Sequence, residues 1–111
     1  MKFIIHSKHL LDEALKLEKQ LGQCYIPGRD TLQDHGDNIL KANLKAMMQS
    51  DKEVYVIWDG GSMGTLFDMG MAYALSKVII PVKLVGGRNW AEYFGSKIGK
   101  TISYEDYTSL S

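Results

Sequence analysis

Residues 54–70 read VYVIWDGGSMGTLFDMG, and this stretch decides the fold. Residues 54–58 are apolar at every position, and a strand without polar alternation is usually covered on both faces, as in a parallel sheet. The glycines that follow permit a sharp turn, and an apolar helix then runs to about Leu75. We therefore expect a central parallel strand that enters a helix through a glycine-rich loop.

The same alternation of strands and helices extends in both directions along the chain. The apolar runs predict strands over residues 2–6, 24–26, 78–85 and, weakly, 101–104. The helical spacings predict helices over residues 10–21, 38–50 and 90–96, with Gly22 ending the first of them. Pro27-Gly28 is expected to close the second strand as a turn. This order predicts an α/β domain of three layers, flavodoxin-like or Rossmann-like, with a mainly parallel sheet of four or five strands.

Length and composition limit the class of protein. The 111 residues suffice for one domain, so we expect residues 1–111 to form a single unit. The 13 basic and 13 acidic residues cancel, which argues against a nucleic-acid polymer as partner. Residues 1–6 are too short an apolar run for a signal peptide, and no stretch approaches membrane-spanning length. We expect no membrane partner and a cytoplasmic location.

Cysteine and histidine give no sign of metal or redox chemistry. Cys24 is the only cysteine, which suits a reducing compartment, and as a nucleophile it lacks a recognisable partner. A small packed side chain is the favoured interpretation. The three histidines, His6, His9 and His35, show no zinc-like spacing with Cys24. We expect neither a metal nor a cofactor.

The loop after Trp58 is the candidate binding site, because ligands of such sheets lie outside the carboxyl ends of the strands. Ser62 is a natural N-cap, and the free N–H groups and macrodipole of the following helix attract anions. A glycine-rich turn with a capping serine and no ligand is the alternative. The spacing matches neither the dinucleotide fingerprint nor a P-loop.

Asp68 and Asn43 are polar residues within predicted helices. We expect Asp68 to lie off its helix's apolar stripe, on a small or flexible face with room for a ligand; an exposed aspartate is the alternative. That stripe is expected to run through Leu66, Met69 or Gly70, and Tyr73. Asn43 falls on a stripe formed by Leu40, Leu44, Met47 and Met48. A buried amide there needs partners, either backbone groups or the base edge of a ligand.

These residues resemble the nucleoside 2-deoxyribosyltransferase superfamily, which includes the deoxynucleoside 5'-monophosphate N-glycosidases. The resemblance covers Val54 to Pro81: an apolar strand, Asp59, a small-residue loop, Gly64-Thr65, two bulky residues, an acid and Gly70. It implies that Asp68 attacks the anomeric carbon of a deoxyribose. A glycosyl–enzyme ester would form, which water or a second base resolves.

The resemblance also implies a set of substrate-binding residues. Ser62 matches a serine that contacts the 5'-phosphate in the hydrolysing branch, and Asn43 would reach the base. Ser7 lies where the family has a small-residue turn after the first strand. Asn89, with Trp90 and Tyr93, follows the Gly86-Gly87 turn and would rim the same or a neighbouring pocket, although core packing of Trp90 is an alternative. The full substrate-binding set is Asp59, Gly60, Gly61, Ser62, Gly64, Thr65, Asn43, Ser7 and Asn89.

Two hypotheses about function follow. The first is an enzyme that cleaves or transfers the N-glycosidic bond of a (deoxy)nucleoside or its 5'-monophosphate. The second is a non-catalytic module that senses or sequesters a nucleotide-derived molecule, and it is favoured by Asp68 standing where the family has glutamate. On the first hypothesis we expect the helix N-terminus and the loop N–H groups to keep the pKa of Asp68 low, with its carboxyl ionised at neutral pH.

An oligomer is also expected. Met63, Met69, Met71 and Tyr73 give more apolar surface than one helix usually needs. Their helix is expected to pack on its symmetry mate in a two-fold homodimer or a higher homo-oligomer, and the family resemblance implies the same.

Overall fold

The computed structural model describes residues 1–59 and 61–84. Four strands are formed: β1 (Lys2–His6), β2 (Cys24–Tyr25), β3 (Glu53–Trp58) and β4 (Val78–Leu84). The helices are α1 (Leu11–Leu21), α2 (Pro27–Asp30), α3 (Gly36–Met48) and α4 (Met63–Ala74), with a single 3₁₀ turn at Lys8–Leu10. No helix within the described residues is long and apolar enough to cross a membrane.

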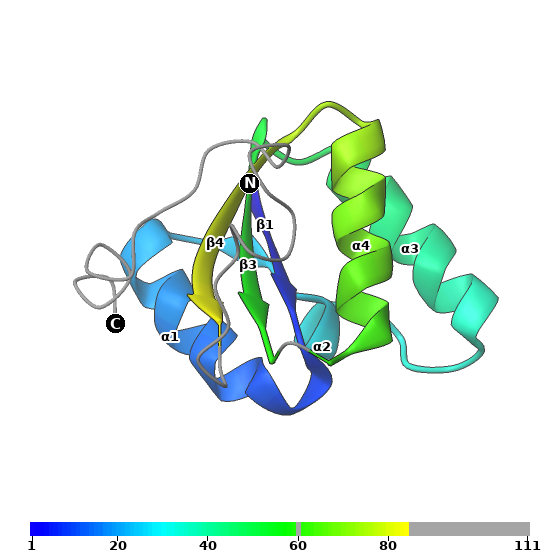
Figure 1. The fold of residues 1–111 in the computed structure, drawn as a ribbon, viewed down its shortest axis with the longest axis horizontal. Helices are drawn as coiled ribbons and strands as arrows, with labels where there is room; N and C mark the ends of the chain where they lie inside the picture. The colour runs from blue at the N-terminus through cyan, green and yellow to red at the C-terminus, as the bar shows by residue number, and fades with distance from the viewer. Residues whose placement is uncertain (60, 85–111) are drawn as a thin grey trace.

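The four strands form one parallel sheet in the order β2-β1-β3-β4. β3 lies between β1 and β4, so the predicted central position and parallel pairing of the apolar strand are confirmed (Figure 1). The order is that of a flavodoxin-like sheet. The expected strand over residues 101–104, the expected helix over residues 90–96 and Val85 lie outside the described residues.

Helices cover both faces of the sheet, which gives three layers (Figure 1). One core, beneath α3 and α4, includes Phe3, Val56, Trp58 and Met69. The other, beneath α1, includes Ile4, Ala14, Leu17 and Cys24. Consecutive residues of β1 therefore contribute to opposite cores, and β3 is apolar from Val54 to Trp58 because each of its faces meets a helix layer. Cys24 is a packed core side chain, as predicted.

Several local expectations need correction. Pro27-Gly28 was expected to be a turn, but it opens the short helix α2, with proline at the first turn where its missing N–H costs nothing. α3 begins at Gly36 rather than Asn38 and ends at Met48. Gly22 ends α1 as predicted, with a φ of 88° that favours glycine.

The apolar stripes of the two helices over the first core are rotated from those predicted. On α4 the buried residues are Thr65, Asp68, Met69 and Ala72, whereas Tyr73 is 62% exposed and Gly70 is exposed. On α3 the buried residues are Asn43 and Met47, and Met48 and Leu44 are exposed. Asp68 was expected off the apolar stripe of its helix and is buried, whereas Asn43 is buried as its place on the predicted stripe indicated. Both polar residues face the gap between α3 and α4.

Candidate functional site

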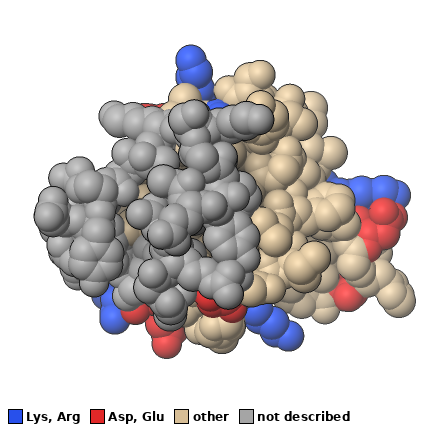
Figure 2. Space-filling model, viewed as in Figure 1, with Lys and Arg blue, Asp and Glu red and all other residues tan. Residues whose placement is uncertain are grey.

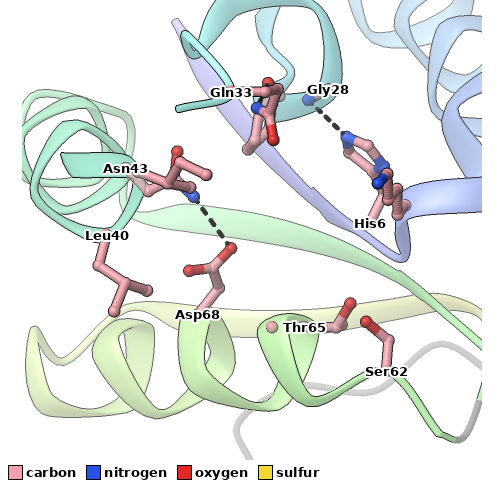
Figure 3. Close-up of a pocket in the computed structure, with 12 residues that line it drawn as sticks. His6, Gly28, Gln33, Leu40, Asn43, Ser62, Thr65 and Asp68 are labelled. Carbon is pink, nitrogen blue, oxygen red and sulfur yellow. Dashed lines mark hydrogen bonds between the residues drawn. The ribbon is translucent and has the colours of Figure 1, made fainter. Parts of the chain in front are cut away.

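A pocket of about 160 Å³ opens at the carboxyl ends of the strands. The chain leaves β1 towards β2 on one side and returns to form β3 on the other, so β1 and β3 define a topological switch point, the usual ligand position in such folds. Residues that follow β1, β2 and β3 line the pocket together with α3 and α4 (Figure 3). The lining residues are His6, Lys8, Pro27, Gly28, Gln33, Ile39, Leu40, Asn43, Ser62, Gly64, Thr65 and Asp68.

Asp68 is the only acidic side chain among the described residues that line the pocket, and it is only 7% exposed. Its Oδ2 accepts a hydrogen bond of 3.3 Å from Nδ2 of Asn43 on the facing helix (Figure 3). Its Oδ1 is buried and has no hydrogen-bond partner among the described residues. A buried carboxylate oxygen without a donor is costly, and such atoms are rare outside functional sites.

Burial raises the pKa of Asp68 from 3.8 to about 6, opposed by the hydrogen bond from Asn43. The expected low pKa is therefore wrong in direction. Asp68 stands beyond the first turn of α4, where the helix terminus has little influence, and the loop N–H groups are bound elsewhere. A carboxyl with a pKa near 6 is nevertheless about nine-tenths ionised at pH 7.

Asn43 belongs to a chain of buried hydrogen bonds. Thr31 Oγ1 donates to Asn43 Oδ1 over 2.7 Å, and the Tyr25 hydroxyl bonds Thr31 Oγ1 in turn. The partners of the Asn43 amide among the described residues are thus two side chains, Thr31 and Asp68, and not the backbone groups that the sequence offered as one alternative. Asn43, which lines the pocket, keeps a second amide hydrogen after the bond to Asp68 is made.

Asp59 organises the glycine-rich loop. Its Oδ1 accepts from the backbone N–H groups of Gly61 and Ser62, at 2.8 and 2.7 Å. Burial raises the pKa of Asp59, but these two bonds oppose it and the net pKa is lowered. The indole of Trp58 donates to the Ser62 carbonyl, which closes the turn from the other side. Asp59 therefore occupies two of the amides that were expected to receive an anion.

The first turn of α4 still offers donors. Ser62 is at the N-cap position, as predicted, but its side chain makes no capping hydrogen bond. Within the part of the chain that the structure describes, no acceptor meets the backbone N–H groups of Met63, Gly64 and Thr65. The Ser62 and Thr65 hydroxyls lie on the same side of α4 as the Asp68 carboxylate (Figure 3).

Ser7 ties the ends of β1 and β3 together rather than lining the pocket. It is fully buried, and its Oγ accepts from the Asp59 backbone N–H at 3.0 Å. That hydroxyl also lies 3.3 Å from Thr65 Oγ1, so it links the loop to the first turn of α4. Ser7 thus holds Thr65, which does line the pocket.

His6 forms the wall opposite α4. Its Nε2 accepts from the Gly28 backbone N–H and its Nδ1 donates to the Ser7 carbonyl, each over 2.9 Å. These partners require the neutral ring with the proton on Nδ1. Burial lowers the pKa of His6, and the bond to Ser7 opposes the shift. With both nitrogens engaged, His6 is a fixed part of the wall and not a free acid or base.

Lys8 and Gln33 are pocket residues that sequence reasoning missed. Lys8 is the only cationic side chain in the lining apart from the titratable His6, and no described residue forms an ion pair with it. The Gln33 amide Nε2 donates to the carbonyls of Pro27 and Thr31, which leaves its Oε1 as an acceptor. The cluster His6-Ser7-Lys8-His9 at the end of a strand was the available signal for Lys8.

The sequence-predicted residues divide into three groups. Asp68, Asn43, Ser62, Gly64 and Thr65 come together in the pocket. Asp59, Gly61 and Ser7 support it from the second layer, as described above. Gly60 and Asn89, together with Trp90 and Tyr93, lie outside the described residues.

Neither a metal-binding group among the described residues nor a similar protein helps to interpret the pocket, whose function has to be inferred from its side chains. Within residues 1–59 and 61–84, no group of three His, Cys, Asp or Glu side chains is arranged to hold a metal ion. No family model, curated protein or solved structure matches the chain.

Proposed function

We propose that this protein cleaves or transfers the N-glycosidic bond of a (deoxy)nucleoside or its 5'-monophosphate, with Asp68 as the nucleophile. The observation that carries the proposal is the free Oδ1 of Asp68, buried at the switch point while Oδ2 is held by Asn43. An ionised carboxylate stabilises an oxocarbenium-like transition state and then bonds to it.

The proposed reaction has two steps. Oδ1 of Asp68 attacks C1' of the sugar from the face opposite the base, the C1'–N bond breaks, and its electron pair leaves with the base, which takes a proton from solvent. The resulting ester is then attacked at C1' by water, or by the nitrogen of a second base. The bond between C1' and Oδ1 breaks, the Asp68 carboxylate is released, and the proton of the attacking nucleophile passes to solvent. Hydrolysis and transfer differ only in this second nucleophile.

The charges of the pocket favour a 5'-phosphate at the end opposite Asn43. The Lys8 ammonium, the Ser62 hydroxyl and the open N–H groups of Met63, Gly64 and Thr65 are all suited to bind phosphate oxygens. Because Asp59 already binds the Gly61 and Ser62 amides, the phosphate would rely on the first turn of α4 rather than on the loop.

We also propose that the protein acts in the cytoplasm as a homodimer or higher homo-oligomer through α4. Met63, Phe67 and Tyr73 are 75%, 55% and 62% exposed, and α4 carries no charged residue except Asp68. The surface over α4 accordingly has no charged side chains in Figure 2. Met69, which the sequence assigned to the same surface, is buried, and Phe67 takes its place.

The direct test is release of free base. The protein is incubated with a panel of deoxynucleosides and their 5'-monophosphates, and the products are separated by chromatography. Asp68→Asn is expected to abolish base release while the affinity for the substrate stays within about tenfold. Asp37→Asn, at an exposed position of α3, is the matched control and should remain active.

Two results would contradict the proposal in different ways. Tight binding of a nucleotide without base release by the wild-type protein favours the non-catalytic binding module. Full activity of Asp68→Asn would remove Asp68 from the role of nucleophile.

A further inference from the structure

We propose that Thr31, supported by Tyr25, is a positioning residue that orients the Asn43 amide so that Asp68 receives a donor on Oδ2 and keeps Oδ1 directed at the substrate. The hydrogen-bonded chain that carries this inference joins β2, the segment after α2, α3 and α4. Its role in catalysis rests on the proposed function, but its effect on Asp68 does not.

The hydrogen bonds from Tyr25 to Asp68 all run in one direction, from donor to acceptor. Thr31 has a single hydroxyl hydrogen and donates it to Asn43 Oδ1, so the Tyr25 hydroxyl must donate to Thr31. With its oxygen fixed by Thr31, the Asn43 amide presents its NH₂ group to Asp68. The reverse amide orientation would place the Asn43 Oδ1 against Oδ2 of Asp68, two acceptors, although Thr31 Oγ1 could still accept from the NH₂ group.

The hydrogen bond between Thr31 and Asn43 is shielded from water. Thr31 and Asn43 are 5% and 3% exposed, so water does not readily replace a lost partner. Without Thr31 the amide oxygen of Asn43 loses the donor that fixes it, so the side chain can turn about its torsions and the bond to Asp68 weakens. Thr31 therefore holds the Asn43 amide in the position that serves Asp68, although Thr31 does not line the pocket.

No other ionisable side chain among the described lining residues forms a hydrogen bond with Asp68. The ionisable side chains that line the pocket with Asp68 are His6 and Lys8. His6 is held neutral by Gly28 and Ser7, and neither His6 nor Lys8 bonds Asp68. The charged residues of α3, including Asp37, Lys41 and Lys45, are exposed. The Asn43 amide is thus the one stabilising group that Asp68 has among the described residues.

The test is the titration of Asp68 by carbon NMR of its carboxyl group, assigned with Asp68→Asn. Thr31→Val keeps the side-chain shape and suits the extended backbone at this position, with φ of −101° and ψ of 130°. It is expected to raise the pKa of Asp68 by roughly half to one unit, because the Asn43 donor is no longer held in place. Thr31→Ser retains the hydroxyl and should restore the wild-type pKa.

Tyr25→Phe provides a second variant if Thr31→Val does not fold. It preserves the ring stacking on Phe3, whose centroid lies 5.3 Å away, and should shift the pKa of Asp68 in the same direction by a smaller amount. Tyr55→Phe, on β3 over the opposite core, is the matched control and should leave the titration unchanged. In the wild type, the Asn43 side-chain amide signals should also titrate with Asp68, and in Thr31→Val they should not.

The outcomes separate this inference from the proposed function. An unchanged Asp68 titration in folded Thr31→Val and Tyr25→Phe overturns it, whatever the activity. A raised pKa supports it even if no substrate releases base. If base is released, the acidic limb of the rate profile should move up with the pKa, and the rate well above that pKa should stay within about twofold; an equal loss at every pH would indicate a merely structural role.

Discussion

The imidazole of His6 and the backbone of Gly28 are in direct contact: Gly28 N–H donates to Nε2 over 2.9 Å, and a Cβ built on Gly28 would lie 2.6 Å from Cε1 of the ring. The contact joins the end of β1 to α2 and forms one wall of the pocket. No L side chain fits at residue 28 unless the ring moves away. The glycine is therefore required by the close approach and not by its φ.

We expect Gly28→Ala to lower the free energy of unfolding by about 1–3 kcal/mol, since it forces His6 out of its two hydrogen bonds. Urea denaturation measures the effect. Gly70→Ala is the control, because a Cβ there meets open space, and alanine within α4 should stabilise the protein by about 0.5–1 kcal/mol. Equal effects of the two substitutions would show that the His6 contact contributes nothing.

Asp68→Asn is expected to stabilise the fold at high pH. The folded-state pKa of Asp68 is raised from 3.8 to about 6, so its contribution to stability is present below pH 3.8 and lost as the pH rises through about 6. The variant has no such titration. Its free energy of unfolding should match the wild type near pH 4 and exceed it by up to about 3 kcal/mol near pH 8.

The control for this measurement is Asp37→Asn, whose side chain is 74% exposed. The free energy of unfolding of Asp37→Asn should differ little from that of the wild type at every pH in this range. A constant difference between Asp68→Asn and the wild type across this pH range would mean that burial does not perturb the carboxyl.

Lys8→Gln tests the proposed phosphate end of the pocket. We expect it to raise KM for a 5'-monophosphate about tenfold, or roughly 1.4 kcal/mol, and to leave the unphosphorylated nucleoside unaffected. Lys16→Gln, on the exposed side of α1, should leave KM unchanged for both the 5'-monophosphate and the nucleoside. If Lys8→Gln weakened both substrates equally, Lys8 would have no part in recognising phosphate.

Phe67→Glu tests self-association through α4. A charge on this apolar surface should shift the mass measured by light scattering from dimer or higher oligomer to monomer. Leu32→Glu is the control, because Leu32 is also exposed but lies outside α4. A wild-type protein that is monomeric at micromolar concentration contradicts the oligomer itself.

The central place and parallel pairing of β3 were predictable because residues Val54 to Trp58 are apolar at every position, a pattern set by two covering layers. The pocket was only partly predictable. Asp68 and Asn43 were recognised as polar residues in apolar helices, but their mutual contact spans 25 positions and depends on how α3 and α4 pack. Periodicity cannot fix that rotation, which is why Tyr73 was wrongly assigned to the core.

The contact between His6 and Gly28 was harder still to predict. Gly28 is 22 positions from His6, and nothing in a proline–glycine pair distinguishes a turn from the first turn of a helix. The pKa of Asp68 was misjudged for a related reason. The backbone N–H groups of the loop were expected to stabilise the ionised Asp68. They are instead bound by the carboxylate of Asp59, which belongs to the same glycine-rich motif.

The two walls of the pocket come from different parts of the chain. Residues 27–43 supply one wall, Lys8 and residues 62–65 supply the other, and Asn43 with Asp68 stands where they meet. Substitutions at Gln33 or Leu40 reshape the first wall without altering the donors of the second. Natural selection can therefore change what is recognised at one end of a ligand while conserving the other end, and divergent descendants of this chain would be expected to differ first at Gln33, Ile39 and Leu40.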